Sequence, residues 1–303
     1  MELKSNGKLN FVIGQWRPIN ENFKGGGHLA MHKLAYKLAE RDQNVYICCE
    51  PYFKHENITQ LICESYINEK GVDMFTVPRI TYNHNNTISV YTQVTWNNPF
   101  NTRNVARWFM YDSDIKIEET FGNDDCYFNY NNFKLKHNNR LKGDLTVYNF
   151  NKNKLWDMGK KRKGYCHIEH KKLTKNSEQF FKNYESTDLT NWRENGGFDF
   201  LREEFNKHEY YLTFDDVSYF SIAAVMCGCK VVIIPNEKNK YKNALQFRKE
   251  NYAQSVGISY GFDDLEWSIL TKGYINNHIN ELEYLADKTV DDFVEFWKKR
   301  LKL

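Results

Sequence analysis

Short apolar runs alternate with segments of helical periodicity along most of the chain. Leu9–Gly14 and Val45–Cys49 are apolar runs of the length expected for buried strands, and His28–Arg41 between them carries leucines at helical spacing. A strand, a helix and a second strand in this order indicate one unit of a parallel sheet. The sequence therefore predicts that the chain begins as an α/β domain.

The same criteria predict further elements in both halves of the chain. Strands are expected at Asp73–Thr76, Ile88–Gln93, Val105–Met110, Asp125–Tyr130 and Gly164–Ile168, and helices at Ile58–Tyr66, Asn176–Asn183, Gly197–Asn206, Ala244–Glu250, Asp264–Leu270 and Ile279–Lys302. The last of these helices is long and amphipathic. The stretch Asn131–Asn153 is rich in Asn and Lys, and we expect a domain boundary within it.

The clearest strand–helix–strand unit lies at 210–235. Its parts are a strand at Tyr210–Phe214, polar capping residues at Asp215, Asp216 and Ser218, a helix at Phe220–Met226, a glycine stop at Gly228 and a buried strand at Val231–Ile234. The amino end of such a helix presents free N–H groups and the positive end of the helix dipole, and so suits a phosphate. An ordinary unit without a ligand accounts for the pattern equally well.

The length, net charge and apolar runs of the chain indicate how many domains to expect and which kinds of protein are excluded. A chain of 303 residues suits two domains of about 150 residues each. With 42 Lys and Arg against 39 Asp and Glu, the net charge of +3 is too small to predict nucleic-acid binding. Leu9–Gly14 is too short for the apolar core of a signal peptide, and no apolar run reaches the length of a membrane span. We therefore expect a cytoplasmic protein without a transmembrane segment.

The cysteines and histidines do not predict a disulfide framework or a metal site. The seven cysteines are an odd number, and their spacing matches no disulfide module, so we expect reduced thiols. His167 and His170 lack the helical spacing of zinc hydrolases, and Cys227 and Cys229 have no second cysteine pair. We therefore expect no bound metal.

The end of the strand–helix–strand unit carries a family resemblance. Cys227–Pro235 reads Cys-Gly-Cys-Lys-Val-Val-Ile-Ile-Pro. With the strand and acidic turn before it, this segment resembles the nucleotide-sugar site of GT-B glycosyltransferases, especially short enzymes of bacterial polysaccharide clusters and large viruses. The resemblance implies an α/β fold with two Rossmann-like domains facing across a cleft. It implies an acceptor domain at 1–145, a nucleotide-sugar domain at 146–278 and a C-terminal helix at 279–303 that returns to the first domain.

One departure from the family concerns the mechanism. Retaining members carry two glutamates eight positions apart, and here those positions hold Asp215 and Ala223. The motif therefore does not support a retaining mechanism.

The resemblance also assigns residues to the donor. The basic residue at the end of a donor-domain strand corresponds to Lys171, with Lys172 beside it, although His170 stands where the family usually has arginine. A cation here would stabilise the charge that develops on the leaving nucleoside diphosphate, so we expect Lys171 to act in catalysis as well as in binding. The other expected donor contacts are Asp188 to the ribose, Phe214 beside the base, and Asp216, Ser218 and Ser221 near the sugar and phosphates. Helix capping explains the serines without a ligand, and a solvated basic turn explains Lys160–Lys163.

A second set of candidates lies around the start of the first helix. The residues are Trp16, Arg17, Gly25, Gly26, Gly27 and His28. The glycines allow the backbone to approach a ligand, and His28 can act as general base on an acceptor hydroxyl. An aromatic ring and a guanidinium are suited to stack on and hydrogen-bond a sugar. A glycine turn with a solvated histidine and a packed surface tryptophan is the plain alternative.

The resemblance implies a metal-independent glycosyltransferase of polysaccharide biosynthesis. It would move a hexose or pentose from a nucleotide-diphosphate sugar, its co-substrate, to a hydroxyl of a glycan or related acceptor, without a cofactor. A sugar-nucleotide epimerase on the same fold and a non-catalytic glycan-binding module remain alternatives. A nicotinamide-dependent oxidoreductase is a third, because Gly25, Gly27 and Ala30 fit G-x-G-x-x-A and Glu50 follows at the place of a ribose-binding acid. About ten residues between strand and glycines speak against it, since that fingerprint needs a tight turn.

Overall fold

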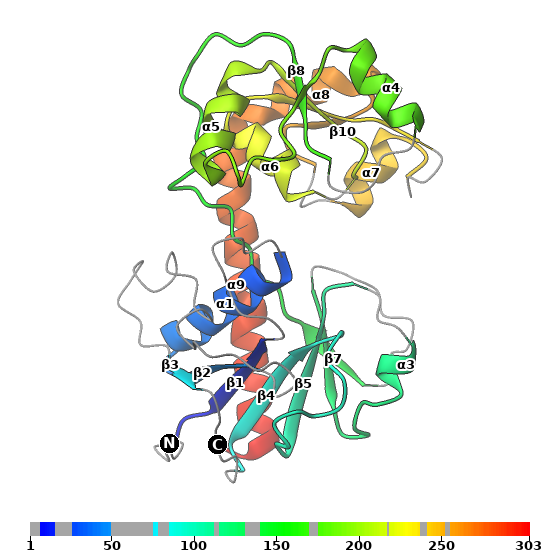
Figure 1. Cartoon of the computed structure of the whole chain (residues 1–303). Helices are drawn as coiled ribbons and strands as arrows, with labels where there is room; N and C mark the ends of the chain where they lie inside the picture. Colours follow the sequence, from blue (N-terminus) through cyan, green and yellow to red (C-terminus); the bar gives the residue numbers. More distant parts are fainter. Residues whose placement is uncertain are drawn as a thin grey trace. The chain divides into compact units, whose positions relative to one another are not determined.

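The computed structural model describes residues 7–15, 26–49, 75–77, 85–111, 115–130, 140–169, 175–216, 218–236, 241–251 and 255–303 of the chain. The chain divides into unit 1, Met1–Asn149 with Glu283–Leu303, and unit 2, Phe150–Leu282. Each unit is built on one parallel sheet with helices (Figure 1). The predicted α/β fold with two Rossmann-like domains is therefore confirmed.

The described part of unit 1 forms a 7-stranded sheet in the order β3-β2-β1-β4-β5-β6-β7. The strands are β1 (Asn10–Gln15), β2 (Asn44–Cys49), β3 (Phe75–Val77), β4 (Thr87–Thr92), β5 (Asn104–Phe109), β6 (Cys126–Asn129) and β7 (Leu141–Asp144), and the helices assigned to the first half are α1 (Gly26–Glu40) and α3 (Ile115–Glu118). All neighbouring strands are parallel. The order reverses between β1 and β4. The predicted helix at Ile58–Tyr66 lies outside the described residues.

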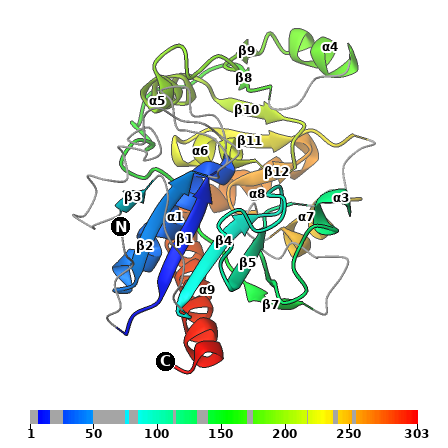
Figure 2. The same ribbon diagram turned by 60° about the horizontal axis from the view of Figure 1, so that its bottom comes forward.

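One face of the unit 1 sheet packs on α1 and on the later part of α9 (Ile275–Leu301). Phe11 of β1 and Phe128 of β6 lie against Phe293 of α9, with ring centroids 5.5 and 4.7 Å apart. Figure 2 shows α9 on the far side of the strands. Because these strand residues are apolar, the later part of α9 removes a large apolar surface from water and completes the core of unit 1.

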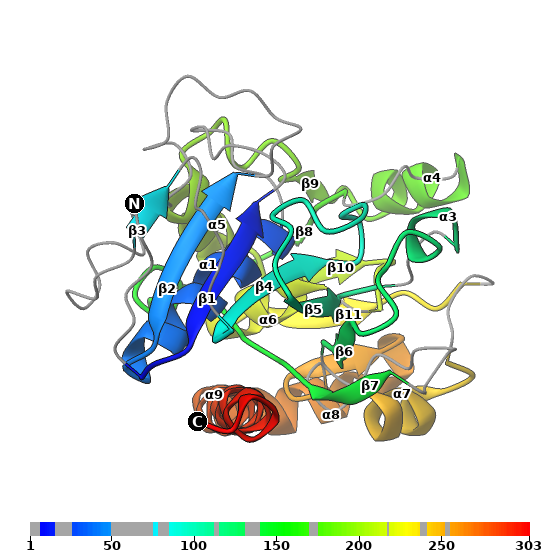
Figure 3. The ribbon, with the colours of Figure 1, turned by 90° about the horizontal axis from the view of Figure 1, so that it is seen from below.

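Helix α9 belongs to both units, since the division falls between Leu282 and Glu283. An ion pair of 2.8 Å between Lys37 and Asp287 joins α1 to the part of α9 in unit 1, and Figure 3 looks along α9. The C-terminal helix that returns to the first domain is therefore confirmed. It begins at Ile275, four residues before its predicted start, because a 3-10 turn leads directly into it.

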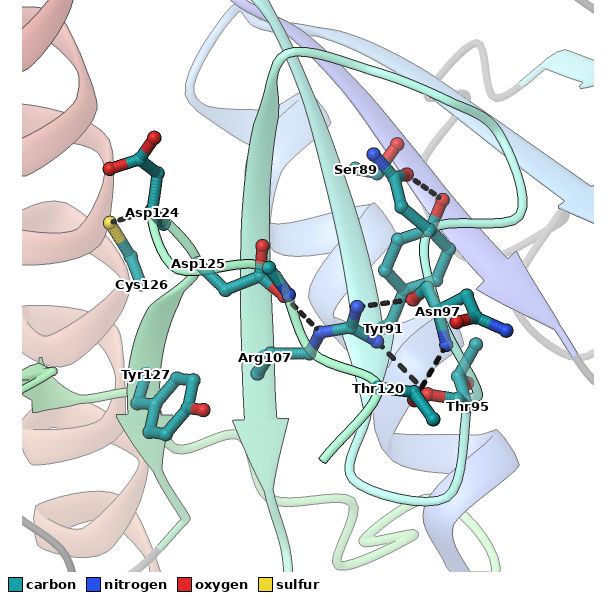
Figure 4. A network of polar contacts seen from close by, with 12 residues as sticks. Ser89, Tyr91, Thr95, Asn97, Arg107, Thr120, Asp124, Asp125, Cys126 and Tyr127 are labelled. Carbon is teal, nitrogen blue, oxygen red and sulfur yellow. Dashed lines mark hydrogen bonds and ion pairs between the residues drawn. The ribbon is translucent and has the colours of Figure 1, made fainter. Parts of the chain in front are cut away.

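A buried arginine holds together the loops on the opposite face of the unit 1 sheet (Figure 4). Arg107 of β5 is fully buried, and its guanidinium donates to the Asp125 carboxylate at 2.8 Å. It also donates to the carbonyls of Thr95, at 3.0 Å, and of Asn97. The charge lies over the Phe121 ring, 4.1 Å from its centroid. These contacts satisfy the buried cation and fix the loop after β4 and the loop before β6.

Unit 2 contains a 5-stranded parallel sheet in the order β12-β11-β10-β8-β9. Its strands are β8 (Tyr165–His167), β9 (Thr187–Asp188), β10 (Tyr210–Thr213), β11 (Lys230–Ile233) and β12 (Ile258–Tyr260). Its helices are α4 (Lys175–Asn183), α5 (Gly197–Lys207), α6 (Tyr219–Met226), α7 (Ala244–Glu250) and α8 (Leu265–Thr271). The strand–helix–strand unit β10–α6–β11 forms as the sequence predicts.

Two strands of unit 2 differ from the sequence-based expectation. Thr187 and Asp188, where no strand was predicted, pair with β8 as the edge strand β9. The short run Ile258–Tyr260 pairs with β11 as the opposite edge strand and was not predicted. None of the helices in the described part of the chain has the length and apolar character that a membrane crossing requires.

Candidate functional site

The candidate site lies at the carboxyl edge of the unit 2 sheet, where the strand order reverses. From β8 the chain runs to β9 at one edge, and it then crosses to β10 on the other side of β8 before continuing to β11 and β12. In open parallel sheets, ligands bind at such a reversal, outside the carboxyl ends of the strands. The residues that follow β8 and β10 are therefore the first candidates.

Side-chain hydrogen bonds to the main chain shape the turn from β10 into α6. The Thr213 hydroxyl accepts from the N–H of Asp215 at 3.0 Å. The Ser218 hydroxyl accepts from the N–H of Phe220 at 3.2 Å, so Ser218 is the N-cap of α6, as predicted. Asp215 and Asp216 precede this cap, and the first turn of α6 contains no acidic residue. The prediction that they also cap the helix is therefore wrong.

Ser221 places a hydroxyl among the apolar side chains of α6. The residue is 1% exposed, and its Oγ has no hydrogen-bond partner among the residues that the structure describes. Side chains of a helix lean toward its amino end, so this hydroxyl lies on the side of the Ser218 cap. A buried hydroxyl without a partner is uncommon, and one next to a helix amino end is suited to an anionic ligand.

The carboxyl end of α6 is fixed by Gly228 and Arg162. Gly228 has a φ of +90°, and a Cβ at this position would clash with the carboxylate of Asp157 and the guanidinium of Arg162. Arg162 donates to the Cys227 carbonyl at 2.8 Å and so caps the helix. Burial acts to raise the pKa of Asp157, but hydrogen bonds from the Gly159 N–H and from Arg162 lower it overall. Arg162 is therefore a capping residue, not part of a solvated basic turn.

Asp216 lies beside two tyrosines at the same edge. Burial raises the pKa of Tyr241 to about 12, and the charge of Asp216 adds to this effect. The pKa of Tyr260 is raised by the same two causes. The Tyr260 hydroxyl donates to the Tyr241 carbonyl at 2.8 Å, and Asn251 donates to the Asp216 carbonyl at 3.1 Å. Asp216 is half-buried, and the hydrogen bond from Asn251 fixes its main chain just after β10.

Phe214 forms part of an aromatic cluster with α4. Its ring centroid lies 5.4 Å from that of Phe180 and 5.4 Å from that of Phe181, both edge to face. Phe214 is half-buried in this packing. It therefore has a structural role, and its contact with a nucleotide base stays a prediction.

Asp188 lies at the same edge of the sheet but not beside Ser218. It ends β9 and is in register with His167, which ends β8. Because β8 separates β9 from β10, Asp188 is about 10 Å from the end of β10, two strand spacings away. Burial lowers the pKa of His167, and the Asp188 charge acts in the opposite sense. The imidazole is therefore neutral near pH 7.

The remaining predicted residues are only partly described. Lys171, Lys172, Trp16, Arg17 and Gly25 lie outside the described residues. Gly26, Gly27 and His28 form the first turn of α1, which follows β1 at the reversal of the unit 1 sheet. By the same rule, this is where unit 1 would bind a ligand. The roles of all these residues stay predictions.

Comparisons with known proteins do not assign a function to the residues of this site. No protein-family model and no curated protein match the chain. Among solved structures, it is similar to the spinosyn forosaminyltransferase SpnP, with a TM-score of 0.38 and 10% identity over 97% of this chain and 95% of that one. MurG from Acinetobacter baumannii gives a TM-score of 0.34 and 8% identity over 95% of each chain. A sucrose-phosphate synthase from Thermosynechococcus elongatus gives 0.41 and 10% over 97% and 96%. Likenesses this distant carry no argument about function.

Proposed function

We propose that this protein is a glycosyltransferase of the GT-B type, which transfers a sugar from a nucleotide-diphosphate sugar to a hydroxyl of a glycan or related acceptor. The donor binds unit 2, where the carboxyl ends of β8 and β10 flank the reversal of its sheet. The acceptor binds unit 1 after β1, at the corresponding reversal. The resemblance of Cys227–Pro235 to a nucleotide-sugar site supports the choice of ligand.

The observation that carries this proposal is the amino end of α6. Ser218 caps the helix at the carboxyl end of β10, and Ser221 adds a buried hydroxyl without a partner among the described residues. The helix dipole and this hydroxyl together suit a diphosphate. A helix that served only to pack the sheet would gain nothing from burying such a hydroxyl, since its desolvation is unfavourable.

The proposed chemistry breaks the bond from the anomeric carbon to the diphosphate oxygen and forms a bond to the acceptor oxygen. The diphosphate gains negative charge as it leaves, and the α6 amino end with Lys171 stabilises that charge. His28 accepts the proton of the acceptor hydroxyl. Lys172 and Asp216 complete the binding of the donor phosphates and sugar. Ala223 is fully buried within α6 and offers no carboxylate at the position where retaining enzymes carry glutamate.

The first experiment is a thermal-shift measurement on the full chain with UDP, GDP, ADP, CMP, NAD and NADP. A ligand at about 100 times its dissociation constant adds about 2.7 kcal/mol to the free energy of unfolding, which is readily detected. We expect stabilisation by one nucleoside diphosphate. Stabilisation by NAD or NADP alone would favour the oxidoreductase, and no stabilisation by any nucleotide would favour a glycan-binding module.

Variants then separate binding from transfer. Lys171→Ala should lose the shift caused by the nucleotide, whereas Lys163→Ala should keep it, because Lys163 is exposed and precedes β8 at the amino edge of the sheet. An equal shift in both variants would remove Lys171 from the donor site. His28→Ala should bind the nucleotide normally and lose transfer to the acceptor, and full transfer by this variant would reject His28 as the base.

A further inference from the structure

Three potential metal ligands meet at the carboxyl ends of β8 and β9. His167 ends β8, Glu169 follows it by two residues, and Asp188 lies in register with His167 at the end of β9. One ligand atom from each side chain lies within 4.8 Å of the other two. The imidazole Nε2 is 4.0 Å from an Asp188 carboxylate oxygen. The strand pairing itself therefore assembles the group.

The imidazole of His167 is already oriented for coordination. The residue is 4% exposed, and its ring stacks on Phe181 with a centroid distance of 3.8 Å and an interplanar angle of 9°. Its Nδ1 is 3.0 Å from the hydroxyl of Ser186, which leaves Nε2 toward Asp188. Metal-binding histidines are oriented in this way, by a hydrogen bond at the nitrogen that does not bind the metal.

Thr190 fixes the Asp188 carboxylate and the main chain of Glu169. Thr190 donates to one oxygen of Asp188 twice, through its N–H at 2.8 Å and through its hydroxyl at 2.5 Å. The same hydroxyl accepts from the N–H of Glu169 at 2.8 Å. Thr190 therefore connects the ends of the two strands and restrains the Asp188 carboxylate, as hydrogen-bonding residues around metal ligands do.

The surroundings are acidic. A pocket of about 510 Å³ opens next to the group, and its charged lining residues are Glu169, Glu178, Glu185 and Lys182. Glu169 and Asp188 also lie close together within the group. Like charges this close repel one another, and a bound cation would remove the repulsion.

We propose that His167, Glu169 and Asp188 bind a divalent first-row transition metal of the Zn²⁺ or Mn²⁺ class. A neutral imidazole and two carboxylates balance a charge of +2, and the nitrogen ligand favours such an ion over Mg²⁺ or Ca²⁺. Ligand atoms around zinc lie about 3.4 Å apart, given bonds of about 2.1 Å. The exposed side chains of Glu169 and Asp188 need to close by at most about 1.4 Å to reach that spacing.

This inference stands apart from the proposed function, because the ion binds without a nucleotide. It gives Asp188 a different partner from the ribose that the sequence suggested. The ion would also join β8 to the two-residue edge strand β9, which has little pairing of its own.

The test uses the full chain, stripped of metal with EDTA and then dialysed against ZnCl₂, MnCl₂ or MgCl₂. Bound metal is counted by mass spectrometry, and the thermal midpoint is measured with and without each ion. We expect Zn²⁺ or Mn²⁺, but not Mg²⁺, to raise the midpoint. Asp188→Asn and Glu169→Gln should each lose about one equivalent of bound metal per chain and lose the rise of the midpoint.

Controls separate this site from cysteines and surface groups that bind zinc. Asp188→Asn keeps an oxygen for Thr190, so its midpoint in EDTA should match that of the unaltered chain. Glu194→Gln, at an exposed position outside the pocket, should keep the full metal content. The proposal is overturned if the unaltered chain binds none of the ions, if it binds Mg²⁺ equally well, or if both site variants keep the full content.

Discussion

Replacing Ser221 by alanine tests the central feature of the donor site. Its hydroxyl is buried and has no hydrogen-bond partner among the described residues. Leaving such a group unsatisfied disfavours the folded state by about 1–3 kcal/mol, and alanine also has the higher helix propensity, by about 0.5 kcal/mol. Ser221→Ala should therefore raise the free energy of unfolding of the free protein by about 1 kcal/mol or more.

Ser218→Ala is the matched control, three positions earlier on the same helix. Ser218 accepts a hydrogen bond from the N–H of Phe220 at 3.2 Å, so its loss removes the N-cap. That change should lower the free energy of unfolding by about 1 kcal/mol. Replacement by alanine is thus expected to change the free energy of unfolding in opposite directions at the two serines.

The assay is the thermal midpoint by calorimetry without nucleotide, followed by titration with the nucleoside diphosphate that stabilises the protein. For a domain of this size, 1 kcal/mol corresponds to a shift of roughly 2–4 °C. The thermal midpoint of Ser221→Ala should be higher by this amount. The variant should also bind the diphosphate about tenfold more weakly, because a hydrogen bond to a charged group is lost. A fall of the midpoint similar to that of Ser218→Ala would show that the Ser221 hydroxyl has a partner, and would refute the reasoning.

Three other features give simple predictions. Arg107→Ala should lower the free energy of unfolding of unit 1 by about 3–5 kcal/mol, because it leaves Asp125 buried without its partner; a loss below 1 kcal/mol in denaturant titration would contradict this. Gly228→Ala should lower stability by about 2 kcal/mol or more, through its positive φ and the clash with the Arg162 cap, and an unchanged thermal midpoint would argue against both causes. Burial raises the pKa of the Cys227 thiol to about 12, so it should stay protonated and resist a thiol reagent at pH 8 until the protein unfolds. The stability it contributes should be full below its unfolded pKa near 9 and be lost as the pH rises toward 12; rapid labelling of Cys227 in the native state would contradict the prediction.

The sequence predicts the elements whose pattern is local. The unit β10–α6–β11 could be found because apolar runs, a capping serine and Gly228 follow one another within a short segment. Gly228 was a reliable stop, since the structure gives it a φ of +90° that other residues rarely adopt. The long C-terminal helix was visible through its amphipathic spacing, and only its start differs.

What the sequence could not show depends on pairing between distant segments. Thr187 and Asp188 are polar and only two residues long, so nothing local marks them as a strand; their place is set by pairing with β8. The same pairing brings Asp188 to His167, and Glu169, two residues after His167, completes the group. Arg162 looked like one of several solvated cations because its acceptor, the Cys227 carbonyl, lies 65 positions away.

The division of α9 between the two units has a consequence for synthesis of the protein. The strands of unit 1 leave the ribosome before those of unit 2, yet Phe293 and Trp297 belong to the core of unit 1. Every strand of unit 2 is made before those two residues. Unit 2 can therefore fold as soon as it emerges. The earlier sheet is covered by α1, but the part of its apolar face that packs on α9 stays uncovered until Trp297 is available. The order of completion is opposite to the order of translation, and the waiting sheet is the species that a chaperone would have to protect.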